Sequence, residues 1–200
     1  MPRSGVRAGL LVVGLGNPGA EFERTRHNLG AEVVALLASR HGQHLRAEKG
    51  TRSAVARTCL AEKVVVLAVP QTYVNDSGLA VGALVRRFGV DETTRIVIVH
   101  DELDLPTGRV KVKAGGGTAG HNGLESVHAH LHDSSYVRVR IGIGKPPGRQ
   151  AGADYVLRRP GRSEREELDV AEEVAADAVE AIATSGVYSA MQRFNTEPVA

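Results

Sequence analysis

Residues 9–19 read Gly-Leu-Leu-Val-Val-Gly-Leu-Gly-Asn-Pro-Gly, and this stretch decides the fold. A short Leu/Val run that is closed by turn residues is typical of a buried strand, so we expect a strand over residues 9–15 and a turn over residues 16–19. The apolar, β-branched run at residues 96–99 predicts a second, central strand. Polar residues follow both runs, which places candidate functional groups at strand ends.

The rest of the chain alternates between strand and helix patterns. Apolar residues at helical spacing follow Asn28, which we expect to be an N-cap, and Gly42 supplies the stop. Ser163 and Glu166 form a capping box, which predicts the start of a long helix. Further strands are expected at residues 55–60, 64–69, 109–113 and 136–143, and further helices at residues 79–88, 122–132, 163–184 and 187–194.

These patterns predict a single α/β domain over residues 1–200, with a mixed β-sheet flanked by helices and a flexible N-terminal tail at residues 1–8. The sheet is expected to be mixed because the two strands around Glu62 form a hairpin and therefore run antiparallel. Two hundred residues can bury a sizeable core without disulfides or metals.

The net charge of +2 is too small to identify a nucleic-acid-binding protein. The distribution of charge along the chain is more informative than the total. Residues 164–180 are strongly acidic, so the rest of the chain is more basic than the net charge suggests. Two interpretations of the basic residues remain open, a solvated surface and a patch that meets phosphate. The residues concerned are Arg109, Lys111, Lys113, Arg138, Arg140 and Lys145.

Cys59 is the only cysteine, so no internal disulfide can form, and its partly apolar surroundings predict a buried, inert thiol. The first apolar run, residues 10–13, is too short for a signal peptide or a membrane span. We therefore expect a cytoplasmic protein.

The glycines of residues 14–19 match the dinucleotide-binding pattern G-x-G-x-x-G after a strand. Such a site needs a helix that opens within the glycines, so that its N-terminus meets the pyrophosphate. Here Pro18 and a charged run intervene, and helical periodicity begins only near Leu29. A sharp turn that presents Asn17 at the carboxyl end of the strand is the favoured interpretation.

His27 is a candidate general base, because an imidazole titrates near neutral pH. A lone histidine is more often structural, so the hypothesis needs an acid that orients the ring. Asp101 follows the central strand and can hold one ring nitrogen, which leaves the other free to take a proton from water. Asp101, Glu102 and Asp104 could instead form a metal site, but neighbouring side chains at a strand end point in different directions. No serine or cysteine nucleophile stands out.

Three asparagines lie in turn-like settings at Asn17, Asn75 and Asn122. Turn chemistry alone explains most such residues, but an amide can also hold a peptide, position a water or stabilise an oxyanion. The glycine-rich segment 115–123 is a loose surface loop, a mobile gate, or a backbone that a ligand approaches closely. It directly follows Lys111 and Lys113, which favours an anionic ligand.

At these residues the sequence resembles the bacterial peptidyl-tRNA hydrolase family, over residues 10–195. The ordered blocks that carry the resemblance are VGLGNPG (13–19), TRHNLG (25–30), TYVNDSG (72–78), HDELDLPTG (100–108), GGGTAGHNGL (115–124) and RVRIGIGKP (138–146). The resemblance implies hydrolysis of the ester between a peptide and the 3′ ribose of tRNA, which recycles tRNA from prematurely released peptidyl-tRNA. It also implies a monomer that needs neither a metal nor another cofactor.

By the same resemblance, the catalytic residues are His27 and Asp101. The implied substrate-binding residues are Asn17, Phe22, Tyr73, Asn75, His121 and Asn122, and the residues that meet tRNA phosphate are Lys111, Lys113 and Arg140. Two positions depart from the family pattern, since Phe22 replaces a usual Tyr and Val74 replaces a usual Met. The alternatives are a non-catalytic RNA-binding module, against which the pair of His27 and Asp101 speaks, and a nucleotide-binding oxidoreductase.

Overall fold

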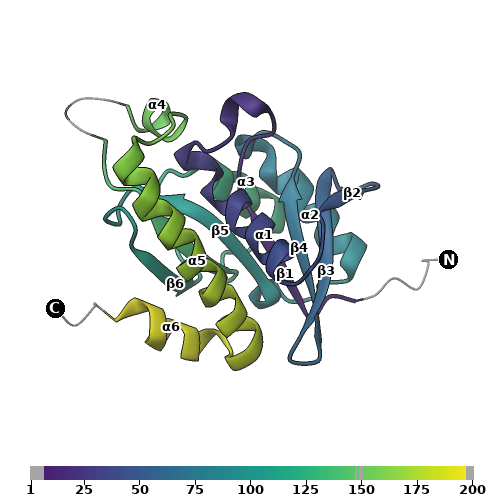
Figure 1. The fold of residues 1–200 in the computed structure, drawn as a ribbon. Helices are drawn as coiled ribbons and strands as arrows, with labels where there is room; N and C mark the ends of the chain where they lie inside the picture. The colour runs from purple at the N-terminus through teal and green to yellow at the C-terminus, as the bar shows by residue number, and fades with distance from the viewer. Residues whose placement is uncertain (1–6, 147, 149–150, 197–200) are drawn as a thin grey trace.

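The computed structural model describes residues 7–146, 148 and 151–196. Within these residues the chain forms one seven-stranded sheet and six α-helices (Figure 1). The strands are β1 (Leu10–Gly14), β2 (Arg46–Glu48), β3 (Ser53–Leu60), β4 (Lys63–Pro70), β5 (Ile96–Glu102), β6 (Val110–Ala114) and β7 (Val137–Gly142). The helices are α1 (Leu29–Arg40), α2 (Ser77–Phe88), α3 (Asn122–Leu131), α4 (Gly152–Val156), α5 (Arg162–Ser185) and α6 (Val187–Asn195).

The sheet has the strand order β2-β3-β4-β1-β5-β7-β6. Its four middle strands, β4, β1, β5 and β7, run parallel, and β2, β3 and β6 pair antiparallel at the two sides. This confirms the predicted α/β class and the mixed sheet. The carboxyl ends of β1 and β5 are neighbours, since Gly14 pairs with Val99, and the polar residues that follow both strands therefore meet at one edge.

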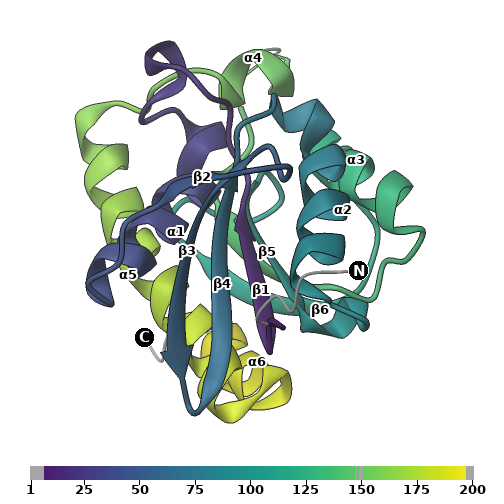
Figure 2. The same ribbon diagram turned by 90° about the vertical axis from the view of Figure 1, so that its right-hand side faces the viewer.

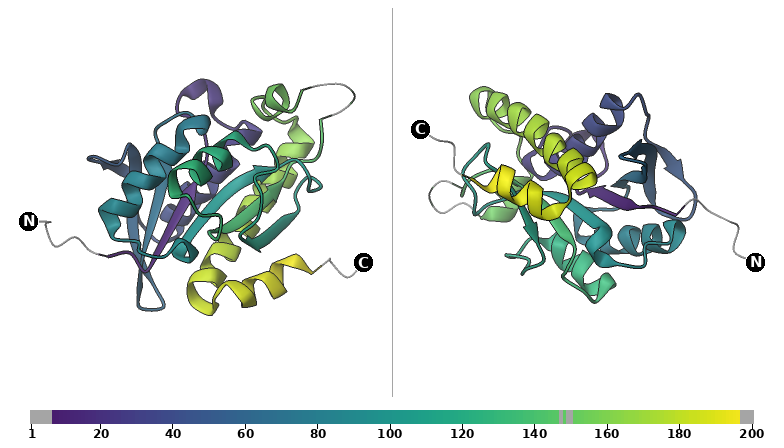
Figure 3. Two further views of the ribbon diagram at one scale, coloured as in Figure 1. Left: turned by 180° about the vertical axis from the view of Figure 1, so that it is seen from behind. Right: turned by 90° about the horizontal axis from the view of Figure 1, so that it is seen from below.

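Two layers of helices cover the sheet, as Figures 2 and 3 show. Helices α1, α5 and α6 bury one face against a large aliphatic core, and α2 and α3 cover the other face. Every residue of β1 and β5 is buried, as expected for central parallel strands. Helix α4 lies at the same end of the molecule as the loop that follows β1 (Figures 1 and 2).

Two glycines bring the start of α1 against the sheet. A Cβ on Gly30 would lie 2.1 Å from the carbonyl oxygen of Val99, and one on Gly14 would lie 2.0 Å from the carbonyl oxygen of Gly30. Leu15 continues the contact, because its N–H donates to Val99 and its carbonyl accepts from Ala31. These glycines therefore serve helix–strand packing, and the helix opens at Leu29, well after the glycine-rich turn.

Asn28 occupies the predicted N-cap position of α1, but its side chain does not cap the helix, and the predicted cap at Ser163 is wrong. Asn28 has a helical conformation, because a 3₁₀ turn (η2, Arg26–Asn28) precedes α1, and its side chain bonds to the backbone of Asn17 instead. Helix α5 begins at Arg162 with Gly161 as its N-cap, so Ser163 lies inside the first turn and cannot cap it.

Two further expectations need correction. Cys59 is exposed rather than buried, because the alternation along β3 turns its side chain outward. The tail predicted over residues 1–8 is too long, since Ala8 is buried and its N–H donates to Phe88, while residues 1–6 lie outside the described residues. The hairpin between β3 and β4, by contrast, is confirmed, and it turns on Ala61 and Glu62, both with positive φ.

Candidate active site

His27 and Asp101 meet at the carboxyl edge of the sheet. His27 lies on η2, which follows β1, and Asp101 lies near the end of β5. Nδ1 of His27 is 3.0 Å from Oδ1 and 3.1 Å from Oδ2 of Asp101. The exposed fractions are 9% for His27 and 2% for Asp101, so bulk water does not compete with this hydrogen bond. The structure thus brings together the two residues that the sequence singled out.

His121 is a second histidine on the same carboxylate. Its Nε2 lies 3.1 Å from Oδ1 of Asp101, while its Nδ1 accepts hydrogen bonds from the backbone N–H groups of Gly123 (3.1 Å) and Leu124 (3.4 Å). A nitrogen that accepts carries no proton, so the proton of a neutral ring lies on Nε2 and is donated to Asp101. His121 therefore caps α3 and orients Asp101 at once. Because both ring nitrogens have partners within the protein, a contact from His121 to substrate would have to use its ring carbons.

The charge of Asp101 sets the protonation of the site. Burial raises the pKa of Asp101, but the nearby rings of His27 and His121 outweigh it and hold the pKa well below its usual range. Burial lowers the pKa of His27, whereas the charge of Asp101 and the hydrogen bond to it raise it, and the net shift is above the ordinary 6.5. Asp101 is therefore an anion, and Nδ1 of His27 donates to it. The free Nε2 of a neutral His27 is left as a base.

His100 lies behind this pair, and no sequence pattern singled it out as a functional residue. Its ring is fully buried, and its Nδ1 donates to the carbonyl oxygen of Asp101 at 2.6 Å. Burial, followed by the neighbouring His121, lowers the pKa of His100 to about 3, so the ring stays neutral. The rings of His100 and His121 pack edge to face with centroids 5.0 Å apart. A neutral His100 thus supports both the backbone of Asp101 and the ring of His121.

His27, Asp101 and His121 each offer a ligand atom, and these atoms lie within 4.8 Å of one another, which raises the question of a metal. To ligate through Nε2, His121 would have to move its proton to Nδ1. That proton would then face the N–H groups of Gly123 and Leu124, which are donors themselves. The hydrogen bonds of this cluster therefore fit two histidine N–H groups that donate to the carboxylate of Asp101 better than they fit a metal site.

Two adjoining cavities of about 250 Å³ and about 210 Å³ form a cleft beside this cluster. Both are lined by His27, Asn122, Ala153 and Val156. The first cavity is also lined by Asp101, Glu102, Leu103, Ala119, Gly120, His121 and Gly152, and the second by Asn17, Val74, Asn75 and Leu157. The cleft therefore gathers the three asparagines and both members of the His27–Asp101 pair.

Asn17 is held in one orientation. Its Oδ1 accepts from the N–H of Val74 at 2.8 Å, and its backbone N–H and carbonyl bond to the side chain of Asn28, each at 2.9 Å. Because Oδ1 must be the atom that accepts, Nδ2 is the atom left as a donor at the cleft. Asn75 (on the 3₁₀ turn η3, Val74–Asp76) and Asn122 are exposed at the same cleft.

Phe22 and Tyr73 pack edge to face, with ring centroids 6.2 Å apart. Neither residue belongs to the lining of the cleft, but Tyr73 directly precedes Val74, which does. Tyr73 is 55% exposed, so this aromatic pair is partly open to solvent.

The three residues expected to meet phosphate lie together on one face of β6 and β7. Lys111 pairs with Arg140 across β6 and β7, and Lys113 is two residues further along the same face. Arg140 also donates to Glu102 at 3.1 Å. Arg138 is not part of this surface, because it is only 3% exposed and its guanidinium donates to the carbonyls of Gly116 and Gly117.

The site thus joins a histidine to an aspartate in a cleft whose described lining contains no serine or cysteine, and a histidine paired with an aspartate is a common feature of hydrolases. The family model for peptidyl-tRNA hydrolase matches residues 11–200. Peptidyl-tRNA hydrolases of Kineococcus radiotolerans and Cutibacterium acnes are 49% and 43% identical to the chain, over 92% and 93% of it and 96% and 98% of their own length.

A crystal structure of peptidyl-tRNA hydrolase from Acinetobacter baumannii superposes with a TM-score of 0.88 at 35% identity, and the match covers 96% of both chains. The chain belongs to the peptidyl-tRNA hydrolase family. It is a hydrolase of the ester bond between peptide and tRNA, which confirms the resemblance that the motif blocks carry. Among the described residues, no helix is both long enough and apolar enough to cross a membrane.

Proposed function

We propose that His27 activates the water that cleaves the ester of peptidyl-tRNA. The observation that carries this proposal is the contact of Nδ1 with both carboxylate oxygens of Asp101, at 3.0 and 3.1 Å. It leaves Nε2 as the unprotonated nitrogen of the neutral ring, and His27 lines both cavities of the cleft.

The reaction takes two steps, and one proton moves in each. Nε2 of His27 takes a proton from water as the water oxygen attacks the ester carbonyl, and the imidazolium that forms is stabilised by Asp101. The tetrahedral intermediate then collapses. The bond to the 3′ oxygen of the ribose breaks, and the proton on Nε2 passes to that oxygen.

Asn17 is suited to stabilise the oxyanion of the intermediate. Its Oδ1 is committed to the N–H of Val74, so the amide presents Nδ2 as a donor. Asn75 and Asn122, both exposed at the cleft, are placed to hold the peptide and the attacking water.

Replacement of the base tests this proposal. The variant His27→Ala should lose about 10²- to 10⁴-fold in kcat on a peptidyl-tRNA, the usual contribution of a general base. His130→Ala is a matched control, because this histidine is exposed on α3. Near-full turnover by His27→Ala would contradict the proposal.

Lys111, Lys113 and Arg140 are proposed to bind tRNA phosphate, which their shared face supports. Alanine substitutions should raise KM for peptidyl-tRNA more than for a minimal peptidyl ester. A plot of the logarithm of the binding constant against the logarithm of the salt concentration should also become less steep, by roughly 0.7–0.9 for each phosphate contact that is lost. Equal effects on the two substrates would argue against phosphate binding by these residues.

We further propose that the enzyme is a cytoplasmic monomer that needs no metal or other cofactor. The tautomer of His121 supports the absence of a metal requirement, and the monomer rests on the family resemblance. Sedimentation of the purified protein and turnover after treatment with a chelator test these points. A dimer in sedimentation would contradict the monomer. Loss of turnover on a minimal ester after the enzyme is treated with a chelator would contradict the absence of a metal requirement.

A further inference from the structure

Arg26, the residue directly before His27, is buried, and four hydrogen bonds hold its guanidinium. Nε and Nη2 donate to the two carboxylate oxygens of Glu164, both at 2.6 Å. Nη1 donates to the carbonyl oxygens of Tyr155 (3.2 Å) and Arg158 (3.0 Å). The guanidinium also lies over the ring of Tyr155, 4.0 Å from its centroid. A planar fork makes all of these contacts at once, which the point charge of a lysine cannot.

All of these partners belong to one segment, residues 152–165, which we call the α4–α5 segment. Its Gly152, Ala153 and Val156 form a wall of the cleft that His27 also lines. Arg26 therefore joins the backbone that carries His27 to one wall of the cleft. Its neighbour Tyr155 is fixed in turn, since its hydroxyl donates to the carbonyl of Ile143 at 2.8 Å.

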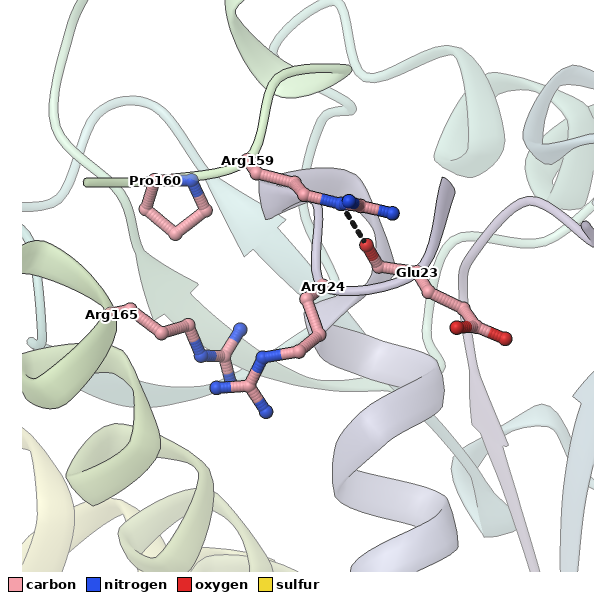
Figure 4. A pocket seen from close by; sticks show the side chains of 5 residues that line it. All are labelled: Glu23, Arg24, Arg159, Pro160 and Arg165. Carbon is pink, nitrogen blue, oxygen red and sulfur yellow. Dashed lines mark hydrogen bonds between the residues drawn. The ribbon is translucent and has the colours of Figure 1, made fainter. Parts of the chain in front are cut away.

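A second, outer contact runs between the same two parts of the chain. Nε of Arg159 donates to the carbonyl of Glu23 at 2.8 Å, and its Nη2 donates to that of Ala20 at 3.1 Å. Figure 4 shows Arg159 reaching across to Glu23 above a cavity that Arg24 and Arg165 also line. Arg159 is exposed, whereas Arg26 is 7% exposed, so the buried contact is the one that water does not loosen.

We propose that Arg26 is a positioning residue for hydrolysis. It holds His27 and the α4 wall at a fixed separation, so that the ester carbonyl lies within reach of the water on Nε2. A shift of about 1 Å between reacting groups can cost about 10²-fold in rate, and one guanidinium with four acceptors restrains such a shift. This inference rests on the proposed role of His27 as the base.

The test compares Arg26→Lys and Glu164→Gln with Arg162→Lys and Glu166→Gln. The control pair also joins an arginine to a glutamate at the start of α5, at 3.1 Å, but is largely exposed. We expect Arg26→Lys and Glu164→Gln to lower kcat on peptidyl-tRNA by roughly 10- to 100-fold, while KM changes little. The control variants should keep the kcat of the wild type.

The kcat of folded enzyme separates positioning from mere stabilisation. A role in stability alone would lower the melting temperature and leave kcat per folded molecule unchanged, and this result would overturn the inference. If Arg26→Lys does not fold, Glu164→Gln carries the same test, because glutamine keeps one acceptor oxygen for the guanidinium. The role of His27 as the base is tested separately by His27→Ala, which keeps Arg26. Near-full turnover by that variant would refute the base without bearing on Arg26.

Discussion

Asp101→Asn is the perturbation that most sharply separates orientation of His27 from simple burial of its ring. The carboxylate accepts three contacts, two from Nδ1 of His27 and one from Nε2 of His121. An asparagine keeps one acceptor oxygen and replaces the other with an NH₂ group. The proton of His121 on Nε2 is fixed by the cap of α3, so the amide oxygen must occupy the Oδ1 position.

The NH₂ group of the variant then lies at the Oδ2 position, 3.1 Å from Nδ1 of His27 in the wild type. The amide oxygen at the Oδ1 position still accepts from Nδ1 of His27, 3.0 Å away in the wild type, but two donors now face each other at the Oδ2 position. The preference for a proton on Nδ1, and with it for a bare Nε2, is therefore weakened. The charge that stabilises the imidazolium is lost as well. We therefore expect kcat to fall by about 10²- to 10⁴-fold, which corresponds to about 3–5 kcal/mol in the activation free energy.

The assay is kcat and kcat/KM on peptidyl-tRNA as a function of pH, with the fold checked by circular dichroism. Asp104→Asn is the matched control, because Asp104 belongs to the same acidic run but is exposed beside Lys145. Without the charge of Asp101, burial dominates and the pKa of His27 falls, so any residual activity should extend to lower pH. A kcat within about tenfold of the wild type, below the usual contribution of a general base, would refute the reasoning.

The same geometry leads to three further predictions. In the wild type, kcat/KM should fall as the pH drops through a pKa above 6.5, because His27 must be neutral to accept a proton; an acid limb centred below 6.5 would contradict the role of Asp101. Asn17→Asp keeps an acceptor for the N–H of Val74 but places a negative charge near the oxyanion, so kcat should fall by about 10²–10³-fold in folded protein, and unchanged kcat would exclude Asn17 as the donor. Gly30→Ala would place its Cβ 2.1 Å from the carbonyl of Val99, so chemical denaturation should show a loss of about 1–3 kcal/mol or more, and wild-type stability would contradict the close packing of α1 on β5.

Much of the fold and the central pair could be predicted from local sequence patterns. The runs before Asn17 and Asp101 identify β1 and β5, and their polar continuations meet because the strands are parallel neighbours. The N-cap position at Asn28 was predicted correctly, but its side chain bonds to the backbone of Asn17 rather than to the helix. The cap of α5 is Gly161, two residues before the predicted Ser163.

The supporting residues could not be predicted in this way. The role of His121 depends on its proton, which is fixed by two backbone N–H groups in the folded loop. Arg26 and Glu164 are 138 positions apart, and no local pattern pairs them. His100 left one usable signal, since it continues the buried run of β5 and lies between Val99 and Asp101.

The tautomer of His27 is the most direct test of the central claim that Asp101 leaves Nε2 as the base. Nitrogen-15 NMR of the histidine side chains, at a pH above the pKa of His27, distinguishes a protonated ring nitrogen from a bare one. We predict a proton on Nδ1 and a bare Nε2 in the wild type. A proton on Nε2 and a bare Nδ1 in the neutral ring would contradict the mechanism.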